Sequence, residues 1–97
     1  MRLSLCLIAR DEEQFIGACL ASAASVVDEI IVVDTGSRDN TVAIAEAAGA
    51  TVVHRPWQND FSAARNASLD AASGDWVLIL DADEQLAPNA RSAIRAA

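Results

Sequence analysis

Residues 76–83 read WVLILDAD, and this stretch decides the fold class of the chain. Its first five residues are apolar, which is typical of a strand that is buried on both faces. Strands of that kind occur mainly in parallel sheets that are covered by helices. Two carboxylates, Asp81 and Asp83, follow at alternate positions. The stretch therefore predicts an α/β domain in which a strand delivers acidic side chains to one edge of a sheet.

Further segments repeat this pattern along the chain. Apolar runs predict strands over residues 2–9, 29–33 and 51–54, with the last strand at 76–80. Apolar residues at helical spacing predict helices over 14–24, 40–48 and 61–71, and Pro88 favours a final helix that reaches the C-terminus. Because strands and helices alternate, we expect one domain over residues 1–97: a Rossmann-like α/β fold with a four-stranded, mostly parallel sheet and helices on both faces.

Polar residues and glycines mark where these helices begin and end. Asp39 and Asp60 are expected to cap the second and third helices, because a carboxylate can accept hydrogen bonds from the first free amides. Gly49 and Gly74 are expected to end the same helices. Asp11 is interpreted either as a cap of the first helix or as a ligand contact, and both interpretations stay open.

The charge balance and the length exclude several classes of protein. Seven basic residues face fourteen acidic ones, a net charge of −7, which argues against a protein that binds a nucleic-acid backbone. No apolar run approaches the roughly 18 residues that a bilayer span needs, and the N-terminus does not resemble a secretory signal. We therefore expect a cytoplasmic protein with no transmembrane segment, in which Cys6 and Cys19 are buried free thiols.

Acidic residues follow three of the four predicted strands. Asp11 and Glu12 follow the first, Asp34 ends the second, and Asp81 and Asp83 follow the fourth. The carboxyl ends of parallel strands lie on one edge of the sheet, where open α/β sheets bind their ligands. Because gathered carboxylates repel one another, this edge favours a bound divalent cation. The oxygen ligands suit Mg²⁺ or Mn²⁺.

Other residues near this edge have a structural as well as a functional interpretation. Arg65, on the third predicted helix, is either a surface residue or a charge partner of the acidic edge. Asp39 is more simply a helix cap than a ligand, and Glu84 is more simply a solvated neighbour. His54 and Trp57 are interpreted as core or loop packing.

Four motifs stand in a fixed order along the chain. They are LIARDEE at 7–13, IVVDTGSRDNT at 31–41, Trp57 followed by FSAARN at 61–66, and GDWVLILDADE at 74–84. Together they resemble the nucleotide-binding half of an inverting, GT-A-fold glycosyltransferase of family 2, in its lipopolysaccharide-glucosyltransferase-like and tetratricopeptide-linked branch. An Asp-X-Asp alone would be weak evidence, whereas four ordered motifs cover nearly the whole chain.

The resemblance implies a nucleotide-sugar donor, UDP-linked, and a Mg²⁺ or Mn²⁺ cofactor. The first loop would line the nucleoside pocket, Asp34 would bond the base or ribose, and Arg65 would contact the base. Asp81 would lie near the ribose and sugar, and Asp83 would coordinate the metal that bridges the diphosphate. The implied donor-binding residues are Ala9, Asp11, Glu12, Asp34, Arg65 and Asp81, and the implied metal ligands are Asp83 and Asp81. The sugar would then pass to an acceptor hydroxyl with inversion.

The chain departs from the family pattern at three points. Asp11 stands where many members have Asn, which adds a negative charge to the nucleoside pocket. Arg10 stands where many members have an aromatic residue, although a guanidinium can also stack on a base. Complete members also need an acceptor-binding half that supplies a catalytic base. No residue here is assigned that role, so we expect an N-terminal piece that binds the donor without turning it over.

Two alternatives belong to other functional classes. A receiver-like phosphoacceptor domain also gathers carboxylates at parallel strand ends, but its site needs a lysine and the chain has none. A non-catalytic interaction module would form a homodimer through an exposed sheet edge. The donor sugar, the acceptor and the identity of the base do not follow from these residues.

Overall fold

The computed structural model describes residues 2–56 and 61–83. Its strands are β1 (Leu3–Ala9), β2 (Glu29–Asp34), β3 (Thr51–His54) and β4 (Trp76–Ile79), and its helices are α1 (Ile16–Ala23), α2 (Thr41–Ala47) and α3 (Phe61–Ala71). Every element expected within these ranges is present, with bounds shifted by at most two residues. The expected cap at Asp60, the packing of Trp57 and the helix from Pro88 lie outside the described residues.

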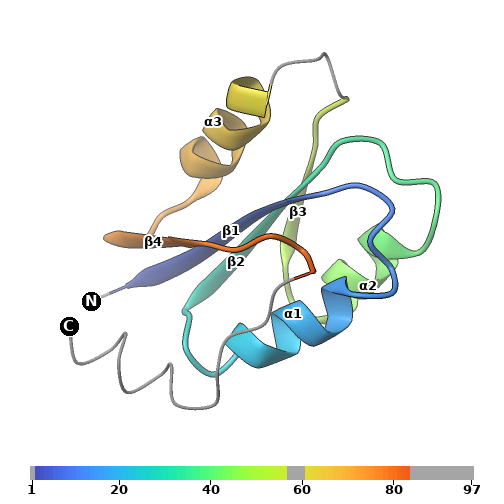
Figure 1. Cartoon of the computed structure of the whole chain (residues 1–97). Helices are drawn as coiled ribbons and strands as arrows, with labels where there is room; N and C mark the ends of the chain where they lie inside the picture. The colour runs from blue at the N-terminus through green and yellow to red at the C-terminus, as the bar shows by residue number, and fades with distance from the viewer. Residues whose placement is uncertain (1, 57–60, 84–97) are drawn as a thin grey trace.

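The four strands are all parallel and lie in the order β3-β2-β1-β4. Helices α1 and α2 pack together on one face of the sheet, and α3 covers β1 and β2 on the other, as Figure 1 shows. The chain runs outward from β1 to β2 and β3, and then crosses back to place β4 on the free side of β1. The strand order therefore reverses between β1 and β4, where sheets of this kind bind ligands.

The two central strands carry the hydrophobic core. Nearly every side chain of β1 and β2 is buried, because each of these strands has a neighbour on both sides and helices on both faces. Their residues on the α1 side form one cluster with the buried face of that helix. The cluster includes Leu5, Leu7, Ala9, Ile30 and Val32 from the strands, and Ile16, Cys19 and Leu20 from α1.

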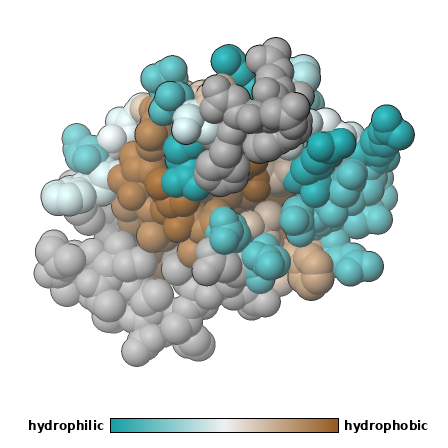
Figure 2. Space-filling model, turned by 45° about the horizontal axis from the view of Figure 1, so that its top comes forward, coloured by the Kyte–Doolittle hydropathy of each residue, from teal (hydrophilic) through white to brown (hydrophobic). Residues whose placement is uncertain are grey.

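The outer strand β4 is more exposed than its apolar sequence predicts. Trp76 is 62% exposed and Ile79 is 41% exposed. The reason is the position of β4, which pairs with β1 alone among the described residues. Figure 2 shows an apolar area bordered by hydrophilic residues on one face of the molecule. The prediction of helices on both faces of the sheet is confirmed, although three side chains of this outer strand, those of Trp76, Val77 and Ile79, remain exposed.

A polar network joins the amino ends of β1 and β2 to the turn before β4. Ser4 Oγ donates to Glu29 Oε2 at 2.6 Å, and the amide of Ser73 donates to the same oxygen at 2.8 Å. The amide of Gly74 donates to Ser4 Oγ at 2.9 Å. Gly74 was expected to end α3, but that helix ends at Ala71. Gly74 instead allows a close approach, because a Cβ there would lie 2.5 Å from Ser4 Oγ.

The helix caps agree with the sequence in part. Gly49 follows α2 with φ +87°, as expected of a glycine that ends a helix. The cap position of α2 is Asn40 rather than Asp39, although Asp39 Oδ1 accepts the amide of Thr41 at 2.9 Å. Helix α1 has no side-chain cap, so Asp11 does not serve as one.

Two predictions from composition can be compared with the structure. Cys6 and Cys19 are both buried and form no disulfide bond with each other, as expected. In the described ranges, no helix has the length and apolar character that a membrane crossing requires.

Candidate functional site

Three strands end side by side at the carboxyl edge of the sheet. The register aligns Ala9 of β1 with Asp34 of β2, and Asp34 with His54 of β3. The amide of Thr35 donates to the carbonyl of Ala9 at 3.1 Å, so the pairing of β1 with β2 continues to the start of the loops. Ala9 and Asp34, two of the predicted donor contacts, are therefore neighbours, and both are buried.

Asp34 is the buried carboxylate of this edge, with a side chain that is 6% exposed. The amide of Ser37 donates to its two oxygens at 3.2 and 3.3 Å, and Nδ1 of His54 lies 3.6 Å from Oδ2. A carboxylate withdrawn from water needs such partners, because its lost hydration is costly. Of the two roles expected for His54, packing in the core is wrong: its side chain is 67% exposed, since β3 is an outer strand.

The loop after β1 is joined to the loop after β2. The amide of Asp11 donates to Ser37 Oγ at 3.0 Å, and the amide of Arg38 donates to Asp11 Oδ1 at 2.8 Å. Asp11 has φ +52°, in the left-handed region that few residues other than Gly, Asn and Asp adopt. Its carboxylate therefore contacts the neighbouring loop.

Two more acidic side chains link the same loops. The amide of Glu13 donates to Asp39 Oδ2, and the amide of Asn40 donates to Glu13 Oε2, both at 3.2 Å. Between them, the amide of Glu12 donates to Thr41 Oγ1 at 2.8 Å. The Thr41 hydroxyl donates in turn to Asp39 and holds the pKa of that carboxyl below its ordinary value. Both carboxylates thus accept hydrogen bonds from the protein's own backbone.

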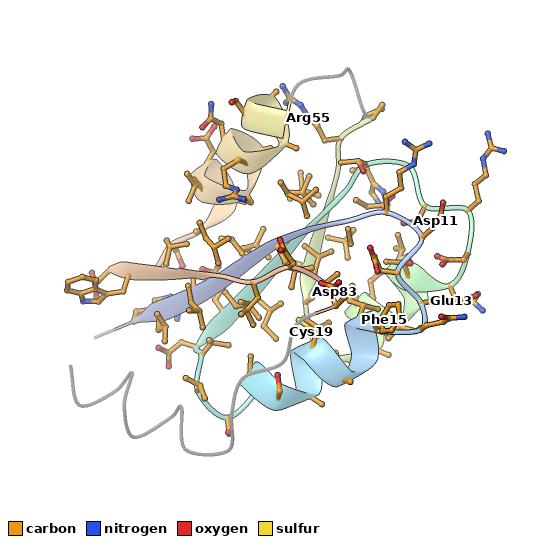
Figure 3. All side chains as sticks on the ribbon, viewed as in Figure 1. Asp11, Glu13, Phe15, Cys19, Arg55 and Asp83 are labelled. Carbon is orange, nitrogen blue, oxygen red and sulfur yellow. The ribbon has the colours of Figure 1, made fainter. Side chains whose placement is uncertain are left out.

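The segment that follows β4 alternates between buried and exposed side chains. Leu80 and Ala82 are buried in the core, whereas Asp81 and Asp83 are exposed. The Cys19 thiol donates to the carbonyl of Asp81 at 3.6 Å and so ties this segment to α1. Figure 3 draws Asp83 near the first turn of that helix. The alternation agrees with the expectation that both carboxylates reach one side of the chain.

The remaining predicted contacts, Glu12 and Arg65, come from different layers. Glu12 is half-buried in the loop that follows Ala9, the last residue of β1. Arg65 is half-buried on α3, on the face of the sheet opposite to α1 and α2. Burial raises the pKa of the Cys6 thiol on β1, and the charge of Arg65 opposes that effect. Arg65 and the loops that join Glu12 to α2 therefore lie on opposite faces of the sheet.

A divalent cation would find few protein ligands at this edge. Among residues 2–56 and 61–83, no three His, Cys, Asp or Glu side chains are grouped so that they could hold a metal ion. Asp81 and Asp83 nevertheless offer exposed carboxylates, which suit Mg²⁺ or Mn²⁺. Mg²⁺ usually binds one or two carboxylates together with substrate phosphates and water. This donor set therefore fits a metal ion that binds together with a diphosphate.

The sequence assigned no role to the two hydroxyl residues that connect the loops, Ser37 and Thr41. The available signal was local, because short polar residues after a strand commonly bond to nearby backbone amides. Their actual partners, the amides of Asp11 and Glu12, lie 26 and 29 residues away in the chain. Only the parallel pairing of β1 with β2 brings these residues together.

This chain is similar in sequence to a known protein family and to several proteins. The model of the family described as glycosyl transferase family 2 matches residues 4–94. A TPR repeat-containing protein of Synechococcus elongatus is 55% identical over 94 residues, which are 97% of this chain and 23% of that protein. An uncharacterized glycosyltransferase of Rickettsia felis is 39% identical over 85 residues, which are 88% of this chain and 30% of that protein.

Two solved structures share the fold of this chain. Glucosyl-3-phosphoglycerate synthase from Mycobacterium tuberculosis, in complex with Mn²⁺, UDP and glucosyl-3-phosphoglycerate, is 34% identical with a TM-score of 0.75, over 87% of this chain and 35% of that one. TarS of S. aureus is 24% identical with a TM-score of 0.81, over 99% of this chain and 32% of that one, and shows the same fold. The chain spans about a quarter to a third of the length of these relatives. Since the family model covers nearly all of it and the fold agrees, the chain belongs to glycosyltransferase family 2 and has the GT-A fold.

Proposed function

We propose that this chain binds a UDP-linked sugar as the donor-binding part of a family 2 glycosyltransferase. The observation that carries the proposal is that Asp34 ends β2 whereas Asp81 and Asp83 follow β4, so the three carboxylates lie on either side of β1, next to the point where the strand order reverses. A ligand at that point would meet one buried carboxylate and two exposed ones. The Mn²⁺ and UDP bound to the mycobacterial relative support the same ligand class for this chain.

Each residue is assigned a role that its position allows. Asp34 would accept a hydrogen bond from the base or ribose, and the segment from Ala9 to Glu12 would line the nucleoside pocket. Asp11 would contribute to that lining through its backbone, because its carboxylate accepts the amide of Arg38. Arg65 would reach the base from the α3 side. Asp81 would lie near the ribose and sugar, and Asp83, with Asp81, would hold the metal ion.

The reaction proposed for the whole enzyme is sugar transfer to an acceptor hydroxyl with inversion. A bound Mg²⁺ or Mn²⁺ supplies positive charge that stabilises a diphosphate leaving group. Asp81 and Asp83 contribute carboxylates at the edge where that group would lie. Inversion also needs a base that deprotonates the acceptor, and none of the residues assigned here has that role. We therefore propose donor binding without turnover for this chain alone.

Calorimetric titration of UDP in the presence of Mn²⁺ tests the proposal, with EDTA replacing the metal in a second titration. We expect saturable binding with Mn²⁺ and a loss of at least about tenfold in affinity with EDTA. The reason is that the proposed ligands are carboxylates, which hold a negatively charged diphosphate only through a cation. Titrations with GDP and TDP test the preference for uridine. Absence of binding for all three nucleotides, in a protein whose circular dichroism shows the folded state, would overturn the proposal.

A second candidate, a dimerising interaction module, is favoured by the exposed edge of β4. That strand carries no charge, and its side chains Trp76, Val77 and Ile79 are all exposed. Uncharged edge strands offer unpaired backbone groups to a second chain. Sedimentation equilibrium of the wild type and of Ile79→Lys separates the two candidates. A concentration-dependent dimer that the lysine abolishes, in a protein without nucleotide affinity, would favour the module over the donor-binding function.

A cytoplasmic location is proposed because the two cysteines do not form a disulfide bond. Cys6 and Cys19 are both buried, and the absence of a disulfide bond between them suits a reducing compartment. Fractionation of cells that express the protein tests this directly.

A further inference from the structure

We propose that hydrogen bonds between residues 11–13 and residues 37–41 hold the β1–α1 loop in its donor-binding conformation. This set of hydrogen bonds is called the loop clasp. Asp11 acts as a positioning residue within it. The inference rests on the proposed donor-binding function. The role inferred here for the Asp11 side chain differs from the role that the resemblance to family 2 implies, which is a charged contact in the nucleoside pocket.

The clasp consists of hydrogen bonds that run in both directions between the two loops. Three consecutive amides of the first loop donate to side chains of the second, and two amides of the second loop donate to side chains of the first. From the first loop, the amide of Asp11 donates to Ser37 Oγ, that of Glu12 to Thr41 Oγ1 and that of Glu13 to Asp39 Oδ2. From the second loop, the amide of Arg38 donates to Asp11 Oδ1 and that of Asn40 to Glu13 Oε2. Such a reciprocal set fixes each loop against the other.

The loop clasp lies directly after the strand ends that form the proposed donor site. Ala9 and Asp34 are register partners at the ends of β1 and β2, and each of the two loops leaves from one of them. Ser37 belongs to both arrangements, because its amide donates to Asp34 while its hydroxyl accepts the amide of Asp11. A change in the clasp is therefore transmitted to the carboxylate proposed to bind the nucleoside.

Asp11 is the strained member of the clasp. Its φ of +52° is unfavourable for an ordinary side chain, while Asn and Asp tolerate that region better and Gly enters it freely. The conformation persists because Asp11 both donates and accepts within the clasp. The side-chain oxygen that accepts the amide of Arg38 needs no negative charge, so an asparagine carbonyl can replace it.

Three substitutions at position 11 separate positioning from direct contact. Asp11→Asn keeps the acceptor and the left-handed backbone, Asp11→Gly keeps the backbone alone, and Asp11→Ala keeps neither. We expect the affinity for UDP with Mn²⁺ to stay within about threefold of wild type for Asn, and to fall about fivefold for Gly and about tenfold or more for Ala. Asp70→Ala, which removes an exposed carboxylate of α3, is the control for loss of charge elsewhere.

Amide hydrogen exchange supplies a measurement that does not need a ligand. If the clasp acts as one unit, Asp11→Ala and Asp11→Gly raise the exchange rates of the Glu12 and Glu13 amides about tenfold or more, although those amides donate to other residues. Asp11→Asn leaves these rates unchanged. The amide of Ala72, which donates to Ser68 at the end of α3, is the internal reference.

The outcomes separate this inference from the proposed function. Equal losses of UDP affinity in Asp11→Asn and Asp11→Ala would show a direct contact through charge and overturn the positioning role. Unchanged exchange at Glu12 and Glu13 in the Gly and Ala variants would overturn the clasp. Failure of the wild type to bind any nucleotide would instead reject the donor-binding function, while the exchange data still decide whether the clasp exists.

Discussion

Nδ1 of His54 on β3 lies 3.6 Å from Oδ2 of Asp34 on β2, and the two residues are register partners at the carboxyl edge of the sheet. The histidine is mostly exposed and the aspartate is almost completely buried. The imidazole therefore borders the one buried carboxylate proposed to meet the nucleoside. This pair lets the role of Asp34 be tested against that of a close neighbour.

Asp34→Asn is expected to weaken binding of UDP with Mn²⁺ by about tenfold or more, because an amide is a weaker acceptor than a carboxylate for a ligand N–H or O–H. The fold should persist, since the amide has nearly the same shape and still accepts from Ser37. His54→Gln is the matched control and should change the affinity by less than about threefold. Equal affinity for Asp34→Asn and wild type, measured by calorimetry, would remove Asp34 from the proposed contacts.

Gly74→Ala is expected to destabilise the protein by about 2 kcal/mol. The new Cβ would lie 2.5 Å from Ser4 Oγ and 2.9 Å from the carbonyl oxygen of Arg2, so the network at the amino ends of the strands must shift. Gly17→Ala is the matched control, because its Cβ would lie 3.5 Å from a side-chain carbon of Ile44 on α2. We expect it to be neutral or stabilising by up to about 1 kcal/mol. Urea unfolding of both variants measures these differences, and equal effects would contradict the crowding at Gly74.

Glu29→Gln is expected to alter the acid dependence of stability. The hydroxyl of Ser4, and after it the amide of Ser73, hold the pKa of the Glu29 carboxyl below its ordinary value of 4.5. A lowered folded-state pKa contributes stability that is full above the unfolded value and is lost as the pH falls through the folded value. The wild type should therefore exceed the variant in unfolding free energy at pH 6, and this advantage should shrink below pH 4.5.

Chemical denaturation at pH 6 and pH 3.5 measures this effect, with Glu46→Gln on the exposed surface of α2 as the control for removing a carboxylate. A Glu29→Gln deficit that stays constant between the two pH values would contradict the assigned role of the Ser4 hydrogen bond.

Neither cysteine is expected to react with a thiol reagent in the folded protein. Cys6 and Cys19 are buried, and burial raises the pKa of the Cys6 thiol, which reduces the reactive thiolate. Ellman's reagent should detect both thiols in urea and neither of them, within minutes, in native buffer. Fast reaction of one thiol before unfolding would show that its side of the sheet opens locally.

The sequence predicted the central part of the fold because there the local patterns and the tertiary environment agree. The apolar runs of β1 and β2 are buried on both faces, and Gly49 adopts the positive φ that ends a helix. Position in the sheet could not be predicted from such runs. The residues of β4 are as apolar as those of β1, yet Trp76, Val77 and Ile79 are exposed because β4 is an outer strand.

The candidate site was predictable to the extent that it depends on strand ends. Asp34, Asp81 and Asp83 reach the expected edge because parallel strands place their carboxyl ends together. The partners of Asp11 were not predictable, because they come from a loop more than twenty residues away. Nothing in the local sequence distinguishes a carboxylate that binds a ligand from a carboxylate that accepts a hydrogen bond from a backbone amide.

The most direct test of the donor-binding claim is calorimetric titration of UDP with Mn²⁺ into Asp83→Ala, with Asp70→Ala as the control for charge. Asp83 is exposed at the carboxyl edge, whereas Asp70 is exposed on α3. We predict that Asp83→Ala loses at least about tenfold in affinity and no longer responds to EDTA, while Asp70→Ala binds as the wild type does. Metal-dependent UDP binding that is equal in Asp83→Ala and Asp70→Ala would contradict the proposed site.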